Sequence, residues 1–211
     1  AATLISRLLG WVKLTTMSSI YGRTLETDAF FAAFAIPDLL YLLVSGGAMT
    51  AAFIPTFTSF IAKGQDDEGW RVASTIWNQI AIFLVVFILI GEIFADKVVL
   101  LLPGFHHNPQ ALAYGVTFVR ILYPMVIFTA LAALCNGVLQ SFNHFTAPAA
   151  SWLVYNVFFI LAAYFFRNSL RLSGVCLGVL GGALAMVLVQ LPVMFKKGMR
   201  YSMSLEWRHP E

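Results

Sequence analysis

Six stretches of the chain are apolar over the length that a helix needs to cross a bilayer, which is about 20 residues. Short polar or proline- and glycine-containing segments separate them. This pattern predicts an all-α polytopic membrane protein, because a membrane β-barrel shows short alternating strands instead. We expect the six transmembrane helices at residues 1–20, 28–62, 72–95, 111–140, 148–166 and 172–195, followed by a basic, interfacial or cytoplasmic tail at 196–211.

The composition agrees with a membrane protein. Of the 211 residues 60% are hydrophobic and 11% are charged, and the mean hydropathy is +0.82. A soluble domain carries about 25% charged residues. The net charge of +3 is scattered beside the apolar runs, so it indicates topology and not a nucleic-acid partner. The two cysteines lie in apolar runs and form no metal or disulfide framework, and we expect no cofactor.

Basic residues between the apolar runs predict the orientation. Six spans place both ends on one side, and the chain begins inside an apolar run, which we interpret as a first transmembrane helix without its start. Loops on that side carry Lys63, Arg71, Lys196, Lys197, Arg200 and Arg208, against Arg23, Lys97, Arg167 and Arg171 on the other. The bias of six to four predicts that both termini are cytoplasmic.

Two cations lie within the first apolar run. Lys13 has apolar residues on both sides for at least a turn, so we expect it to face a protein-lined cavity. Arg7 lies about 120° round the same helix, either in that cavity or at a headgroup. The small residues Ser6 and Gly10 share a stripe with Lys13 and are expected to let a neighbouring helix approach closely.

The second apolar run carries a carboxylate and several helix breakers. Asp28 begins the run after a loop, which is typical of a helix N-cap and compatible with a proton or ion site. Proline and paired glycines interrupt the run, so bends are expected. These bends are either static kinks or hinges that move as a cavity opens and closes, at Pro37, Gly46, Gly47 and Pro55.

Motifs for hydrolytic, metal-dependent or nucleotide-dependent chemistry are absent from the sequence. It contains no HExxH, no Cys/His metal spacing, no phosphate-binding GxxxxGK[ST] and no serine nucleophile elbow. A glycine-rich face at Gly174, Gly178, Gly181 and Gly182 is interpreted as helix packing. The absence of the catalytic and nucleotide-binding motifs disfavours an enzyme.

The chain resembles the MurJ (MviN) lipid II flippase family over nearly its whole length. Residues 6–10 (SRLLG) are similar to the family's opening S-R-x-x-G, and residues 27–34 (TDAFFAAF) to its D-A-F-F-x-A-F. Residues 36–40 (IPDLL) resemble I-P-N-L-L, and residues 47–55 resemble G-A…A-F-V-P. Later segments also fit, at 103–105, 136–148 and 190–192. The order and ungapped spacing of these motifs carry the resemblance.

The resemblance implies a transporter of the multidrug/oligosaccharidyl-lipid/polysaccharide superfamily in the bacterial cytoplasmic membrane. Such proteins have two six-helix lobes around a cationic cavity, and two further helices that form a lipid-tail groove. This chain would be the first lobe, with a second lobe and membrane lipid as partners. The implied substrate is lipid II, the undecaprenyl-diphosphate-linked peptidoglycan precursor, moved by alternating access. Arg7, Lys13 and Asp28 are the substrate-binding residues that carry over.

Departures from the family pattern leave the substrate open. Lys13-Leu14 stands where the family usually has Arg-Asp, which removes a carboxylate that would orient the cation. Tyr41-Leu42 replaces Arg-Arg, and Gly46 replaces Glu. Either the second lobe supplies more charge, or the substrate differs, or this copy is degenerate. The alternatives are an exporter of another lipid-linked oligosaccharide or of drugs, and a non-transporting membrane scaffold.

Overall fold

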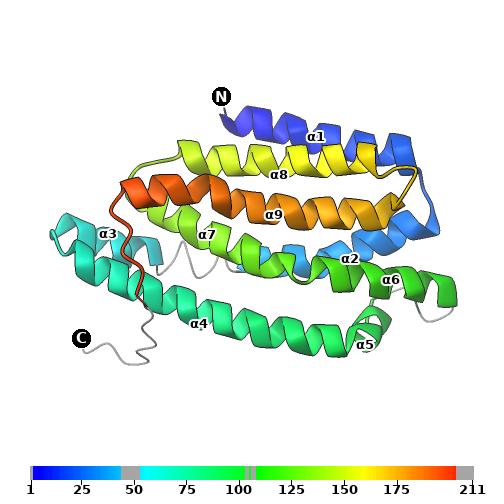
Figure 1. Cartoon of the computed structure of the whole chain (residues 1–211), viewed down its shortest axis with the longest axis horizontal. Coiled ribbons are helices and arrows are strands. Elements are labelled where there is room, and N and C mark those ends of the chain that lie inside the picture. Colours follow the sequence, from blue (N-terminus) through cyan, green and yellow to red (C-terminus); the bar gives the residue numbers. More distant parts are fainter. Residues whose placement is uncertain (1, 44–52, 103–104, 106–107, 203–211) are drawn as a thin grey trace.

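The computed structural model describes residues 2–43, 53–102, 105 and 108–202, with side chains from residue 8 onward. These residues form nine α-helices (Figure 1). The helices are α1 (Ala2–Tyr21), α2 (Leu25–Leu42), α3 (Ile54–Ala62), α4 (Asp66–Ile93), α5 (Ala95–Leu100), α6 (Pro109–Leu122), α7 (Met125–Ser141), α8 (Thr146–Phe165) and α9 (Arg171–Lys196).

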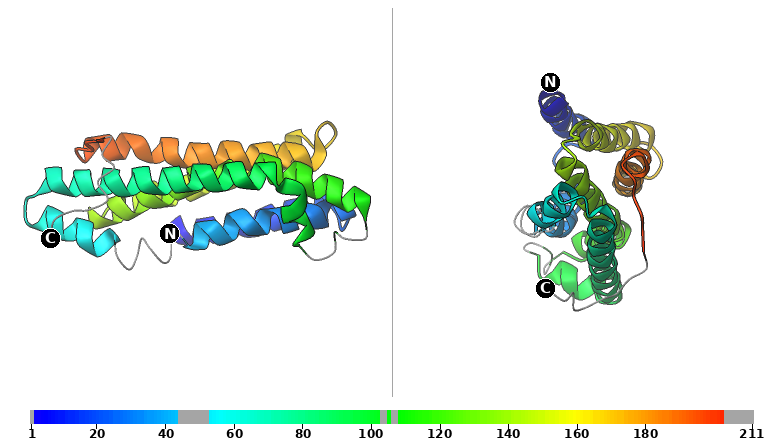
Figure 2. Two further views of the ribbon diagram at one scale, coloured as in Figure 1. Left: turned by 90° about the horizontal axis from the view of Figure 1, so that it is seen from below. Right: turned by 90° about the vertical axis from the view of Figure 1, so that its left-hand side faces the viewer.

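The long helices lie side by side along one common direction, and the short α5 crosses it steeply near one end (Figure 2). α1 packs on α8, α8 packs on α9, and α9 packs on α7. α2 lies against α6 and α7, whereas α4 lies at the edge of the bundle and contacts mainly α3 and α7. The α8–α9 pair forms the most extensive contact between any two described helices.

Three of the described helices are long and apolar enough to cross a membrane, namely α4, α8 and α9. α6 and α7 meet at an angle of 41° and add a fourth span if they are counted as one. α1 and α2 fall outside this set; α1 carries Lys13, and α2 carries three carboxylates. The predicted class, an all-α membrane protein, is confirmed, and the count of six spans stays a prediction.

The helix predicted at 111–140 is divided. α6 ends at Leu122, and α7 begins at Met125 after Tyr123 and Pro124. Proline has no N–H to donate to the preceding turn and its ring collides with that turn, so the helix bends there. The predicted helix at 72–95 instead begins at Asp66, because three acidic residues in its first turn interact favourably with the helix dipole.

The structure corrects the expectations for the second apolar run. α2 begins three residues before Asp28, because the Thr24 hydroxyl accepts a hydrogen bond from the Thr27 N–H at 3.2 Å and caps the helix. Asp28 is therefore not the N-cap. Pro55 lies in the first turn of α3, where the missing N–H costs nothing, and its predicted role as a hinge stays a prediction.

The glycine-rich face of α9 packs against α8, as predicted. A Cβ at Gly178 would lie 2.1 Å from the Cβ of Ala162, and one at Gly174 would lie 2.3 Å from the Cβ of Phe166. Small residues thus bring the two helices together. The expectation for Gly10 was wrong, because no atom lies within 4 Å of the space that a Cβ would occupy there. The Ser6 side chain lies outside the described residues.

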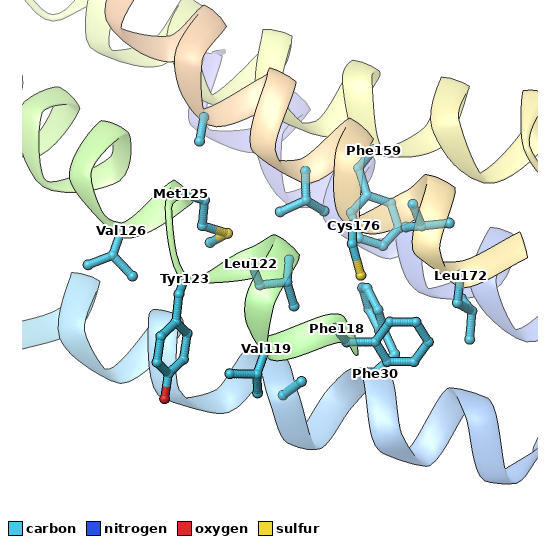
Figure 3. Close-up of a cluster of buried hydrophobic side chains, with 14 of the residues drawn as sticks. Phe30, Phe118, Val119, Leu122, Tyr123, Met125, Val126, Phe159, Leu172 and Cys176 are labelled. Carbon is cyan, nitrogen blue, oxygen red and sulfur yellow. The ribbon is translucent and has the colours of Figure 1, made fainter. Parts of the chain in front are cut away.

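Aromatic rings join α2 to α6 and α8 in the core (Figure 3). The buried Phe30 ring meets the rings of Phe118 and Phe159 edge-to-face, each at a centroid distance of 6.1 Å. Such pairs contribute roughly 0.5–1.5 kcal/mol beyond the area they bury. They hold α2 and α8 in a fixed register next to α1, and this register determines what surrounds Lys13.

A buried carboxylate joins the first turn of α2 to the start of α9. Glu26 is 7% exposed and accepts hydrogen bonds from the Arg171 guanidinium, at 2.9 Å from Nε, and from the Leu172 N–H. The Tyr21 hydroxyl donates to the Ala163 carbonyl at 3.1 Å. No local sequence pattern indicates this pair, because 145 residues separate Glu26 and Arg171 in the chain.

Candidate functional site

Lys13 lies in the interior of α1 and points between α2 and α8. It precedes the end of the helix at Tyr21 by eight residues, or about 12 Å at 1.5 Å per residue. Its Nζ atom lies 4.8 Å from the ring centroid of Phe159, 5.6 Å from that of Phe34 and 5.9 Å from that of Tyr155. Three aromatic rings from two helices thus surround one ammonium group.

These rings only partly compensate the charge of Lys13. Cation–π contacts contribute about 0.5–2 kcal/mol each, according to their exposure. Among the described residues, no carboxylate lies within 4 Å of the ammonium, the limit for an ion pair. A cation away from water costs several kcal/mol without a partner. The arrangement therefore leaves Lys13 able to bind an anion.

A cavity of about 70 Å³ opens beside the ammonium. Five helices line it, with the residues Lys13, Phe34, Asp38, Tyr41, Met125, Thr129, Trp152, Tyr155 and Met186. The cavity has room for a few water molecules. It is well below the roughly 300–1,000 Å³ of a typical ligand pocket, so by itself it can contact only part of a larger ligand.

One stripe of α2 forms a wall of this cavity. Phe34, Asp38 and Tyr41 follow i, i+4, i+7 spacing and therefore lie on one face of the helix. The Tyr41 ring meets the Trp152 ring of α8 edge-to-face at 5.4 Å. Asp38 is exposed at the outer side. A carboxylate in a membrane helix normally faces a polar space, so this face of the bundle is unsuited to contact with lipid.

Sequence reasoning missed this carboxylate. Asp38 belongs to residues 36–40, whose resemblance to I-P-N-L-L assigns no role to its carboxylate. A charged residue one turn after an aromatic residue, inside an apolar run, was the available signal. Leu14 stands where the family usually has an aspartate next to the cation, and it carries no charge. Asp38 instead supplies a carboxylate near Lys13.

The structure brings only some of the predicted site residues together. Asp28 is exposed on α2, ten residues or about 15 Å along the helix from Asp38, and so lies away from the cavity. Pro37 is buried inside α2 next to Asp38. Arg7 belongs to α1, but its side chain lies outside the described part, as do Gly46 and Gly47. No group of three potential metal ligands occurs among the described residues.

Comparisons with known proteins identify a family for this chain. The family model "Lipid II flippase MurJ" matches residues 17–211. The chain is 34% identical over 200 residues to "Lipid II flippase MurJ" of Burkholderia cenocepacia, covering 93% of this chain and 39% of that protein. It is 32% identical over 210 residues to "Probable lipid II flippase MurJ" of Buchnera aphidicola subsp. Acyrthosiphon pisum, covering 98% and 41%.

A solved structure has the same fold. "Lipid II flippase MurJ, inward closed conformation" superposes with a TM-score of 0.82 at 20% identity, over 97% of this chain and 42% of that one. The chain thus spans about two fifths of the length of these relatives. The family match covers far more than half of the chain, and the resemblance drawn from the motifs is confirmed. The chain belongs to the lipid II flippase MurJ family, whose members are membrane transporters and not enzymes.

Proposed function

We propose that this chain is the first of two transmembrane lobes of a lipid II flippase in the bacterial cytoplasmic membrane. In this proposal Lys13 binds the anionic diphosphate of the substrate from the first lobe. The observation that carries the proposal is the Lys13 ammonium, which lies inside a helix bundle among three rings with no carboxylate in ion-pair distance among the described residues. Attraction between such a cation and a diphosphate is far stronger there than in water.

The size of the cavity supports a site shared between two lobes. A lipid-linked disaccharide-peptide headgroup is many times larger than about 70 Å³, so most of its contacts must come from elsewhere. The exposed Asp38 marks a face that is unsuited to lipid. Alternating access by the movement of one lobe against another around a shared site meets both requirements.

Transport of labelled lipid II tests the proposal. In liposomes with lipid II labelled in one leaflet, the full natural gene product is expected to raise the crossing rate well above that of protein-free liposomes. The 211 residues alone are expected to stay near the protein-free rate. No transport by the full product would contradict the flippase function. Transport by the 211-residue chain, shown to be monomeric, would contradict the requirement for a second lobe.

We further propose that the α3–α4 connection and the end of α9 are cytoplasmic. Both lie at the same end of the bundle (Figure 1), and Arg200 of the tail pairs with Asp67 of α4. A cysteine at position 65 is expected to react with a membrane-impermeant thiol reagent only from the cytoplasm, and one at position 108 only from outside. The native Cys135 and Cys176 are buried and give a low background. The reverse pattern of labelling would contradict the orientation.

A further inference from the structure

Asp38 brings a second charge to the cavity that contains Lys13. Both side chains line this space, from α2 and α1 respectively. The carboxylate interacts electrostatically with the Lys13 ammonium and with the Tyr155 hydroxyl. It is not within the 4 Å of an ion pair. The two opposite charges therefore line one small cavity without forming an ion pair.

The two charges determine the net charge of the site. Among the described residues that line the cavity, Lys13 is the only cation and Asp38 the only anion. The other lining residues are aromatic, or are Met125, Thr129 and Met186. The cavity is thus neutral with Asp38 ionised and would carry one positive charge without it. A negatively charged ligand in this cavity is attracted by Lys13 and repelled by Asp38.

We propose that Asp38 is the resident counter-ion of Lys13. In the empty site it attracts the ammonium toward the cavity, and it acts as a positioning residue for Lys13. When an anionic headgroup binds, the headgroup replaces Asp38 as the partner of Lys13. The headgroup then lies near the Asp38 carboxylate, which has the same sign of charge and repels it. Asp38 therefore also lowers the affinity of the site for anions. This second effect rests on the proposed function, whereas the first concerns the empty protein.

A double-mutant cycle on the full natural gene product, without substrate, tests the counter-ion role. Asp38→Asn removes the charge and keeps the shape, and it is expected to lower the melting temperature by about 1 °C when Lys13 is present, since the shift becomes smaller as the chain becomes longer. In the Lys13→Met background, which has no ammonium, the same change is expected to have little effect. Asp38→Glu, which keeps the charge, is expected to restore most of the loss, and high salt to reduce the coupling.

An equal effect of Asp38→Asn in both backgrounds would overturn the counter-ion role, because a merely structural residue does not depend on Lys13.

Lipid II transport tests the effect on affinity. Asp38→Asn is expected to lower the KM for lipid II about tenfold, since one repulsive charge is removed. An unchanged KM would overturn the lowered affinity. Absence of transport in every variant would contradict the proposed flippase, and the cycle would still decide the counter-ion role.

Discussion

Lys13→Met in the full natural gene product is expected to abolish growth of cells that are depleted of their own lipid II flippase. Methionine fills nearly the same volume among the rings of Phe34, Tyr155 and Phe159, but it carries no charge. Loss of one hydrogen bond to a charged group costs roughly 1.5–3 kcal/mol. A loss of that size lowers affinity about tenfold or more.

Two measurements separate this loss of function from a loss of folding. Because Lys13 is a cation that the rings only partly compensate, Lys13→Met is expected to leave the melting temperature unchanged or to raise it. Lys13→Arg keeps the charge and can stack on the same rings, so it is expected to support growth. Normal growth with Lys13→Met, at matched protein level, would remove Lys13 from the substrate site.

Gly178→Ala is expected to produce the largest loss of stability among single-methyl additions on α9. The added Cβ would lie 2.1 Å from the Cβ of Ala162 and 3.2 Å from the carbonyl oxygen of Phe158, so α8 and α9 must separate. Overpacking of this kind costs about 1–3 kcal/mol. Alanine gains back up to about 1 kcal/mol from its higher helix propensity. The net result is a lower melting temperature, measured in detergent by intrinsic fluorescence.

Gly10→Ala provides the matched control. It adds the same methyl group within a helix, at a position where no atom lies within 4 Å of the new Cβ. The propensity gain then stands alone, so the melting temperature is expected to stay constant or to rise slightly. Equal melting temperatures for Gly178→Ala and Gly10→Ala would show that α8 and α9 do not approach as closely as described.

The linear order of residues was enough to predict the class and the family of the protein. Long apolar runs require helices in a membrane, because every backbone polar group must then be satisfied within its own segment. The ordered motifs in residues 6–55 predicted the family that the comparisons confirm. The apolar residues on both sides of Lys13 predicted that it faces the protein interior, since a charge in contact with lipid is costly.

Packing between distant segments decided the rest. Lys13 lies beside Tyr155 and Phe159, which follow it by more than 140 residues, and no local pattern states which helix faces will meet. Thr24, and not Asp28, is the N-cap of α2. No atom lies within 4 Å of a Cβ built at Gly10, although Gly10 shares a small-residue stripe with Ser6. Helix periodicity defines the face of a single helix, whereas the pairing of faces depends on many small contacts summed over the whole bundle. That sum places Asp38 and Lys13 beside one cavity, so the pairing of these two charges emerged only from the tertiary structure, although Lys13 itself was predicted from the sequence.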